Sequence, residues 1–149
     1  MATPLLPPDF KEFLQLLNAN QVEYLLIGGY AVGYYGYVRA TADMDIWIGS
    51  SPDNAIKTVA TLREFGFDVP NLSEALFLQA DNIVRMGVPP FRIEILTSIS
   101  GLRFEVCYAE RVIDSIDGVE IPLISLPHLK INKRASGRLK DLTDLEHLP

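Results

Sequence analysis

The stretch Asp43-Met-Asp-Ile-Trp-Ile48 constrains the fold of this chain more than any other segment. In a β-strand, side chains alternate between the two faces. Met44, Ile46 and Ile48 therefore point into a core. Asp43 and Asp45 lie side by side on the opposite face, where two carboxylates repel each other unless water or a cation separates them. The segment is thus either a half-buried strand with a solvated acidic rim or a strand that presents a Mg²⁺ site, because Mg²⁺ commonly binds one or two carboxylates plus substrate phosphates.

A glycine pair upstream supports the metal-site interpretation. Gly28-Gly29 follows the apolar segment 24–27, which is typical of a short buried strand, and opens a helix that we expect over residues 30–37. By itself a glycine pair indicates only a turn. At this position, however, glycines let backbone N–H groups approach a phosphate at the positive end of a helix dipole. The order of strand, glycine turn, helix and Asp-x-Asp strand places a phosphate cradle beside two metal-ligand candidates.

A third carboxylate stands on a second predicted strand, residues 91–97. Ile93 and Ile95 face the core there, which leaves Glu94 on the opposite face with Arg92. A third carboxylate is what a site needs to hold two metals about 4 Å apart for an in-line displacement. The alternative is that Glu94 belongs to a cross-strand ion pair on the protein surface.

The remaining segments alternate between helical and strand patterns. We expect the following helices and strands: helices from Asp9 to about Asn18, over 30–37, from 52 to about 66, and over 73–79, 126–136 and 140–147, with strands over 24–27, 43–48, 82–86, 91–97, 111–116 and 119–125. The last two strands form a hairpin centred on Asp117-Gly118, and residues 1–8 are expected to be irregular. This order predicts an α/β (α+β) fold, a mixed β-sheet flanked by helices, in a single domain over residues 1–149.

Charge and composition limit the range of possible binding partners and cellular compartments. The net charge of −6 argues against general duplex-DNA binding, because phosphate neutralisation supplies most of that affinity. Residues 130–140 nevertheless carry five basic and no acidic side chains, which suits a bound phosphate group. A single cysteine, Cys107, indicates a reducing compartment. Because no signal peptide and no apolar run of about 18 residues is present, we expect a cytoplasmic protein without membrane contact.

Three blocks of sequence together resemble the DNA polymerase β nucleotidyltransferase superfamily. Its signature is a hydrophobic residue followed by Gly and then Gly or Ser, about a dozen further residues, an Asp-hydrophobic-Asp run and a later strand carboxylate. The chain is most similar to the minimal nucleotidyltransferases related to abortive-infection type IV toxins, over residues 24–147. The matching runs are Ile27-Gly-Gly29, Arg39-Ala-Thr41-Ala-Asp43-Met-Asp45, Glu94 and Lys133-Arg-Ala-Ser-Gly137-Arg138-Leu-Lys140-Asp141-Leu-Thr-Asp144. Many members carry Ser where Gly29 stands, so this chain lacks a hydroxyl there.

The resemblance implies a metal-dependent nucleotidyltransferase. With Mg²⁺ (or Mn²⁺) as cofactor, such an enzyme moves a nucleotidyl group from a nucleoside triphosphate such as ATP to an acceptor hydroxyl on RNA, a protein or a small molecule. Asp43, Asp45 and Glu94 would be the metal ligands and, with Lys133, the catalytic residues. The residues implied to bind the nucleotide are Gly28, Gly29, Arg39, Thr41, Lys133 and Arg138. The same resemblance implies the toxin of a toxin–antitoxin pair, with an antitoxin as partner.

Two other functions remain open at this point. Gly29 and the small size of the chain are also compatible with a catalytically silent member of the fold that binds a nucleotide or a partner. A metal-dependent phosphohydrolase would use paired carboxylates as well, but usually with histidine ligands, and His128 and His147 are remote from the motif strands. Trp47 shares the face of the carboxylate pair and is a candidate border of the nucleotide pocket.

The basic segment has an alternative interpretation too. Lys133 and Arg138 either contact the outer phosphate oxygens or lie on a solvated helical face near a helix C-terminus. Asp141 and Asp144 either orient these basic side chains or are ordinary acidic caps of the last helix.

Overall fold

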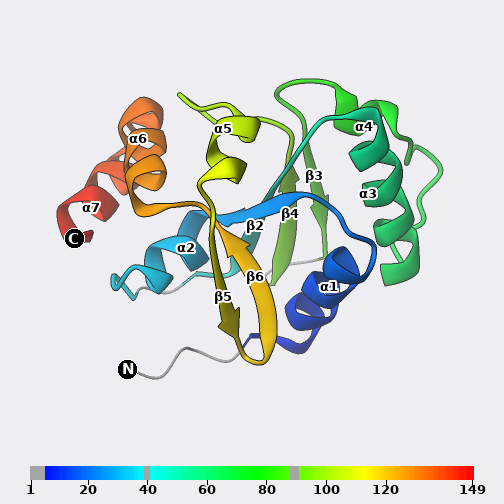
Figure 1. Cartoon of the computed structure of the whole chain (residues 1–149), viewed down its shortest axis with the longest axis horizontal. Coiled ribbons are helices and arrows are strands. Elements are labelled where there is room, and N and C mark those ends of the chain that lie inside the picture. Colours follow the sequence, from blue (N-terminus) through cyan, green and yellow to red (C-terminus); the bar gives the residue numbers. More distant parts are fainter. Residues whose placement is uncertain (1–5, 39–40, 88–90) are drawn as a thin grey trace.

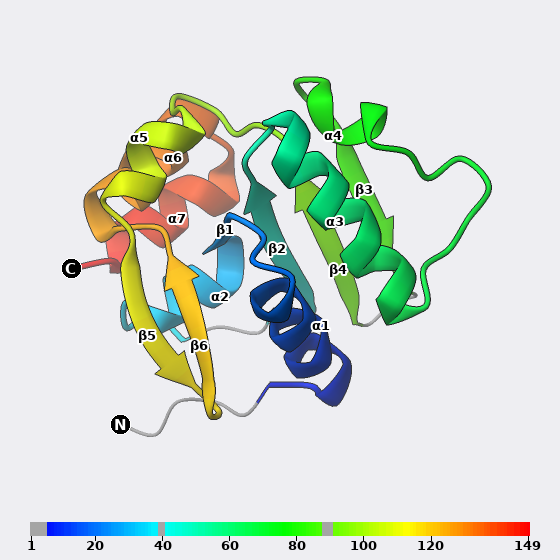
Figure 2. The same ribbon diagram turned by 45° about the vertical axis from the view of Figure 1, so that its right-hand side comes forward.

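The computed structural model describes residues 6–38, 41–87 and 91–149. Over these ranges the chain forms one mixed sheet with helices on both faces (Figure 1 and Figure 2). The elements, in chain order, are α1 (Pro8–Ala19), β1 (Tyr24–Ile27), α2 (Gly28–Tyr34), β2 (Asp43–Ile48), α3 (Pro52–Phe65), α4 (Ala75–Leu78), β3 (Ile83–Met86), β4 (Arg92–Leu96), α5 (Phe104–Ala109), β5 (Val112–Ile116), β6 (Val119–Leu123), α6 (Leu126–Ser136) and α7 (Leu139–His147). The predicted fold class, a mixed sheet flanked by helices, is confirmed.

The sheet has the strand order β3-β4-β2-β1-β6-β5. Strands β1 and β2 are antiparallel, and β2 is parallel to β4, so the two carboxylate-bearing strands lie next to each other. The β5–β6 hairpin closes through Asp117 and Gly118, both with positive φ (51° and 78°), as a two-residue turn of the kind that matches strand twist. This hairpin was predicted from its Asp-Gly dipeptide.

One face of the sheet carries the larger core, beneath α1, α3 and α4. Met44, Ile46 and Ile48 are fully buried there, together with Phe13 and Leu62 from the covering helices. The alternation predicted for the Asp43–Ile48 strand is therefore confirmed. Because every second residue of β2 is committed to this core, its remaining side chains are presented to the other face.

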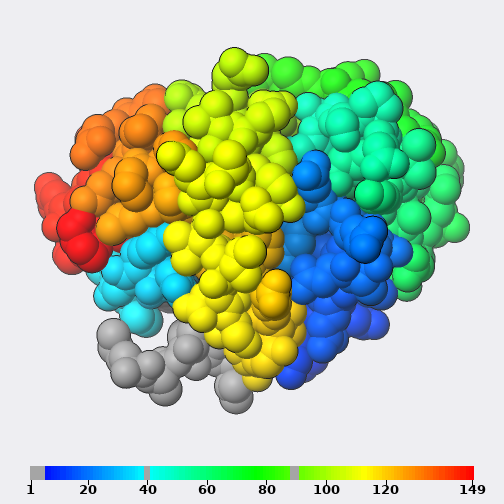
Figure 3. Space-filling model, in the orientation of Figure 1, coloured from blue at the N-terminus to red at the C-terminus, as the bar shows by residue number. Residues whose placement is uncertain are grey.

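The other face is covered by α2, α5, α6 and α7. Helix α5 was not predicted from the sequence. Its Phe104 packs edge-on against Trp47, with ring centroids 5.2 Å apart, and Trp47 is only 1% exposed. Trp47 is therefore part of the second core, and its predicted place at the border of a nucleotide pocket is wrong. In Figure 3 the segment that contains α5 and β5 separates α2 and α6 on one side from α1 and α3 on the other.

Four helix starts, those of α1, α2, α4 and α7, differ from prediction by one or two residues. Helix α1 begins at Pro8 after Pro7, so Asp9 lies in the first turn and is not the first residue of the helix. Helix α2 begins at Gly28 instead of residue 30, and the glycine pair is therefore its first turn. Within the described ranges, no helix is both long and apolar enough to cross a bilayer.

Candidate functional site

The strand register brings the predicted carboxylates together on one face of the sheet. Asp45 of β2 lies directly opposite Glu94 of β4, and Asp43 lies opposite Arg92. On the other side of β2, Asp45 pairs with Ile27, the last residue before the glycine turn. Since neighbouring strands are about 4.8 Å apart, the three carboxylates and the start of α2 form one compact group. Side-chain alternation predicted the shared face, and the parallel β2–β4 pairing sets the register.

Two arginines neutralise two of these carboxylates. Arg92 donates from Nε to Asp43 Oδ1 (3.3 Å) and from Nη2 to Asp43 Oδ2 (3.2 Å). Arg85, on β3, donates from Nε to Glu94 Oε1 (3.2 Å). The cross-strand alternative considered for Glu94 is thus realised in this structure, with Arg85 as its partner. Neither arginine was predicted to belong to the site, although Arg92 shares the polar face of its strand.

Asp45 differs from the other two carboxylates. No ion pair to a described residue neutralises it, and burial together with the nearby charges of Glu94 and Asp43 raises its pKa to about 7. Lys140 and Lys133 oppose this shift from the other side. A buried carboxylate beside two others is a position that a divalent cation would relieve, because the cation favours the ionised form.

The three carboxylates are hard oxygen donors on adjacent strands, the type of ligand that Mg²⁺ and Mn²⁺ prefer. Within the described part of the chain, no three His, Cys, Asp or Glu side chains already converge in a metal-binding arrangement. Asp43 and Glu94 are paired with Arg92 and Arg85 instead. A cation bound here would have to share Asp43 and Glu94 with these arginines or displace them.

Both residues of the glycine pair must be small, because neighbouring side chains lie close against their backbone. Gly28 has a left-handed backbone (φ +67°), and a Cβ at this position would collide with the Asp45 carboxylate. A Cβ on Gly29 would lie 2.5 Å from Thr41 Oγ1, whose hydroxyl donates to the Asp43 carbonyl (3.3 Å). Thr41 thus occupies the space that a serine side chain at position 29 would need. The same contact brings a hydroxyl next to the glycine turn.

A cleft of about 330 Å³ opens beside Asp45. Its lining combines predicted and unpredicted residues, namely Ile27, Gly28, Gly29, Asp45, Asp81, Leu96, Ser98, Ile99, Ser100, Asn132, Lys133, Ser136, Arg138 and Lys140. Lys133, Arg138 and Lys140 are the basic side chains of this lining and are called the basic wall below. The serines and Asn132 were missed, because no local pattern marks a polar residue as one that faces a cleft. Arg39 lies outside the described residues, so its nucleotide-binding role stays a prediction.

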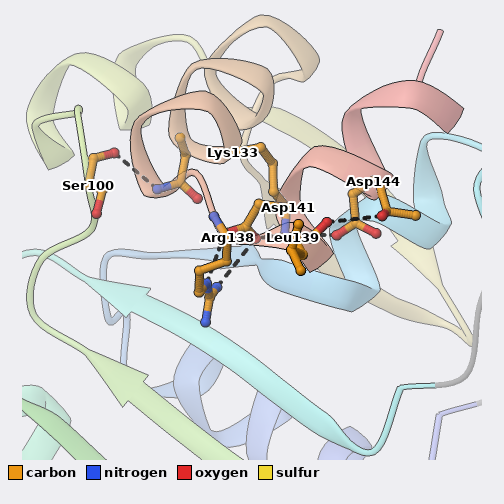
Figure 4. A network of polar contacts seen from close by, with 8 residues as sticks. Ser100, Lys133, Arg138, Leu139, Asp141 and Asp144 are labelled. Carbon is orange, nitrogen blue, oxygen red and sulfur yellow. Dashed lines mark hydrogen bonds and ion pairs between the residues drawn. The ribbon is translucent and has the colours of Figure 1, made fainter.

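Lys133 lies in a buried network, and the solvated-face interpretation of this residue is wrong. Its Nζ is 3.2 Å from Asp141 Oδ1 and 3.1 Å from Asp144 Oδ2, and the three side chains are at most 5% exposed. Arg138 also donates to Asp141, from Nε to Oδ2 at 2.8 Å (Figure 4). Although burial opposes the effect, hydrogen bonds from Arg138, Ser136 and Lys133 keep the pKa of Asp141 below its usual range.

The two aspartates therefore orient the basic side chains, which was one of the two interpretations left open. Asp141 additionally accepts from the backbone N–H of Arg138 (3.3 Å) at the start of α7. Among the described residues, His128 and His147 make their contacts with groups other than the three site carboxylates, as expected for structural residues. His128 is paired with Glu110 and His147 stacks on Tyr37.

Comparison with known proteins agrees with this architecture. No family model matches the chain, and no curated protein matches its sequence. Among solved structures, it is similar to a crystal structure of a proposed nucleotidyltransferase from Thermotoga maritima, with 14% identity over 92% of this chain and 88% of that chain and a TM-score of 0.63. The chain has a nucleotidyltransferase-like fold. At this identity the likeness concerns the fold, and the activity has to be argued from the site.

Proposed function

We propose that this chain is a metal-dependent nucleotidyltransferase that moves a nucleotidyl group from a nucleoside triphosphate to an acceptor hydroxyl. The observation that carries the proposal is the register of Ile27, Asp45 and Glu94 across three adjacent strands. It aligns the glycine turn and two carboxylates in one row, next to the basic wall of Lys133, Arg138 and Lys140. The nucleotidyltransferase-like fold supports the same conclusion.

Each group has a role that follows from its chemistry. The backbone N–H groups at Gly28 and Gly29 would bind phosphate oxygens at the start of α2. Arg138 would contact the outer phosphates through its guanidinium fork, and Lys133 would add a fixed positive charge. Asp43, Asp45 and Glu94 would hold Mg²⁺ or Mn²⁺, which neutralises charge and aligns the attacking and leaving oxygens when it is bound.

The buried Lys133–Asp141–Asp144 network supports a role for Lys133 in substrate binding. Burying an ammonium group this deep costs hydration, and its two aspartates compensate for that cost and hold the side chain in place. The side chain also lines the cleft next to Asp45, and its charge offsets part of the rise in the pKa of that carboxyl, which burial, Glu94 and Asp43 cause. We infer that the network pre-positions one positive charge for the triphosphate, which reduces the cost of organising the site on binding.

The variant Glu94→Gln distinguishes a nucleotidyltransferase from a catalytically silent nucleotide-binding protein. We expect the variant to retain most of its nucleotide affinity, because the glycine turn and the basic wall are untouched, and to lose transfer of α-labelled nucleotide to components of a cell extract. Each of the four triphosphates is offered with Mg²⁺ and with Mn²⁺. Glu120→Gln, an exposed strand glutamate on β6, is the matched control. Metal-dependent nucleotide binding without any labelling by the wild-type protein would favour the silent binder. Equal labelling by Glu94→Gln and wild type would remove Glu94 from the catalytic residues.

A further inference from the structure

The cleft beside Asp45 extends along the direction of β4. One of its ends is the glycine turn, which is level with Asp45 because Ile27 and Asp45 are in register. The other end is the segment 98–100, which follows the C-terminal end of β4 at Leu96. Since β2 and β4 are parallel and each strand residue advances the chain by about 3.3 Å, this segment lies well beyond the level of Asp45 and Glu94.

The basic side chains of the cleft act at the end that holds Asp45. Lys140 and Lys133 oppose the rise in the pKa of Asp45 that burial and the neighbouring carboxylates cause. The hydrogen bond with Asp141 is the main cause of the raised pKa of Arg138, and the charge of Asp45 adds to it. The basic wall is therefore coupled electrostatically to this end of the cleft, which is the place for the phosphates of a nucleotide.

The end of the cleft beyond β4 has a different chemistry. Its polar side chains are neutral or acidic, namely Asp81, Ser98, Ser100 and Asn132. Asn132 of α6 donates from Nδ2 to the Ser100 carbonyl (3.0 Å; Figure 4), so α6 contacts this end of the cleft as well. A phosphate beside Asp81 would face a like charge, so this end suits the uncharged nucleoside part of a triphosphate.

Asp81 is held in place by Ser98. The Asp81 N–H donates to Ser98 Oγ (2.9 Å), and Ser98 Oγ donates to Asp81 Oδ1 (2.8 Å). Beside this pair, the Asn82 N–H donates to Thr97 Oγ1 (2.9 Å), which ties the chain before β3 to the chain after β4. Asp81 has a left-handed backbone (φ 60°), a conformation that aspartate adopts more readily than most residues. Its carboxylate is thus a positioned hydrogen-bond acceptor on the cleft wall.

We propose that Asp81, positioned by Ser98, binds the ribose hydroxyls of the nucleotide and makes the cleft selective for ribonucleoside over deoxyribonucleoside triphosphates. The inference rests on the proposed function, because it requires a triphosphate in the cleft. An ionised carboxylate accepts hydrogen bonds and donates none, so its partner in the ligand must carry O–H or N–H groups. The vicinal 2′- and 3′-hydroxyls of ribose offer two such donors to one carboxylate, and an acidic residue recognises the ribose 2′-hydroxyl in dinucleotide-binding folds. A 2′-deoxyribose offers only one.

Equilibrium binding measures this selectivity without turnover. The probes are α,β-methylene analogues of the four ribonucleoside triphosphates and of their 2′-deoxy counterparts, titrated calorimetrically in the presence of Mg²⁺. Wild type should bind the ribonucleotide of its preferred base at least ten-fold more tightly than the deoxyribonucleotide, because one charge-assisted hydrogen bond corresponds to roughly ten-fold or more in affinity. Asp81→Gly should remove this preference, and Ser98→Ala should reduce it, because the carboxylate would lose its positioning contact.

The choice of glycine separates the carboxylate from the backbone conformation. Glycine adopts a left-handed backbone readily, so Asp81→Gly removes the side chain without straining the chain at this position. Asp117→Gly is the matched control, because Asp117 is also an aspartate with a left-handed backbone (φ 51°) but lies in the β5–β6 turn. The control should keep the preference of wild type for the ribonucleotide.

Three results would contradict the inference in distinguishable ways. Equal binding of ribo- and deoxyribonucleotides by wild type, or an undiminished preference in Asp81→Gly, would overturn it while the proposed function stands. An Asp81→Gly protein that loses affinity for one base but keeps the sugar preference would show that Asp81 contacts the base, which also overturns it. If wild type binds no triphosphate, the proposed function fails first and the inference falls with it.

Discussion

Asp45→Asn removes one charge from the most crowded part of the carboxylate face and should stabilise the metal-free protein. The pKa of Asp45 is raised from 3.8 to about 7, first by burial and then by Glu94 and Asp43. Between these values the folded state holds a proton that the unfolded chain has released. Stability contributed by the protonated form is therefore present below pH 4 and is lost as the pH rises to about 7. One pKa unit corresponds to about 1.4 kcal/mol, so a shift of about three units sets an upper limit near 4 kcal/mol.

The asparagine variant has the same shape and no charge to desolvate. Above pH 7 we expect its free energy of unfolding to exceed that of wild type by about 2–4 kcal/mol, and the difference should vanish near pH 4. Urea unfolding in the presence of EDTA measures this directly, because Trp47 is the sole tryptophan and is buried. Asp68→Asn, an exposed residue with an ion pair to Arg63, should show no such gain.

Divalent metal should narrow or cancel the difference in stability between the two proteins. Wild type gains about 2.7 kcal/mol when free metal is 100 times its dissociation constant, whereas Asp45→Asn lacks a central ligand and should gain little. A metal-free Asp45→Asn protein that is less stable than wild type at pH 8 would show that the charge of Asp45 does not destabilise the fold. A gain that is the same at pH 4 as at pH 8 would show that the effect has nothing to do with ionisation.

Three further substitutions probe the cleft and the glycine turn. Lys133→Ala removes the buried ammonium group that lies between Asp141 and Asp144 and should lower the free energy of unfolding by about 3–5 kcal/mol, whereas Arg134→Ala, a change at an exposed position of the same helix, should have little effect in the same urea titration. Arg138→Ala should keep the fold, because the side chain is 67% exposed, and should weaken triphosphate binding about ten-fold or more by calorimetry. Gly29→Ser should destabilise the protein through the collision with Thr41 Oγ1, and Thr41→Ala should restore part of the loss. Thermal unfolding that shows Gly29→Ser and wild type to be equal would remove this explanation for the glycine.

Most elements were predictable because their signals are local. Alternating apolar residues gave the strands that carry Asp43 and Glu94, and the Asp117-Gly118 dipeptide gave the hairpin. Gly137, with a left-handed backbone, ends α6 where the sequence indicated. Helix α5 was missed because six residues contain too few turns to display a helical period.

What the sequence determined by itself is which side chains share a face, since the two-residue period of a strand and the backbone freedom of glycine are properties of the chain alone. Asp43 and Asp45 had to lie together, and so did Arg92 and Glu94. Only the tertiary structure decided which strands are neighbours, and hence that Asp45 meets Glu94 while Asp43 meets Arg92. Likewise, a lysine on a polar helix becomes buried only because α7 docks its two aspartates against it. Burial and electrostatic pairing depend on distances between segments far apart in the sequence, and those distances are set by packing.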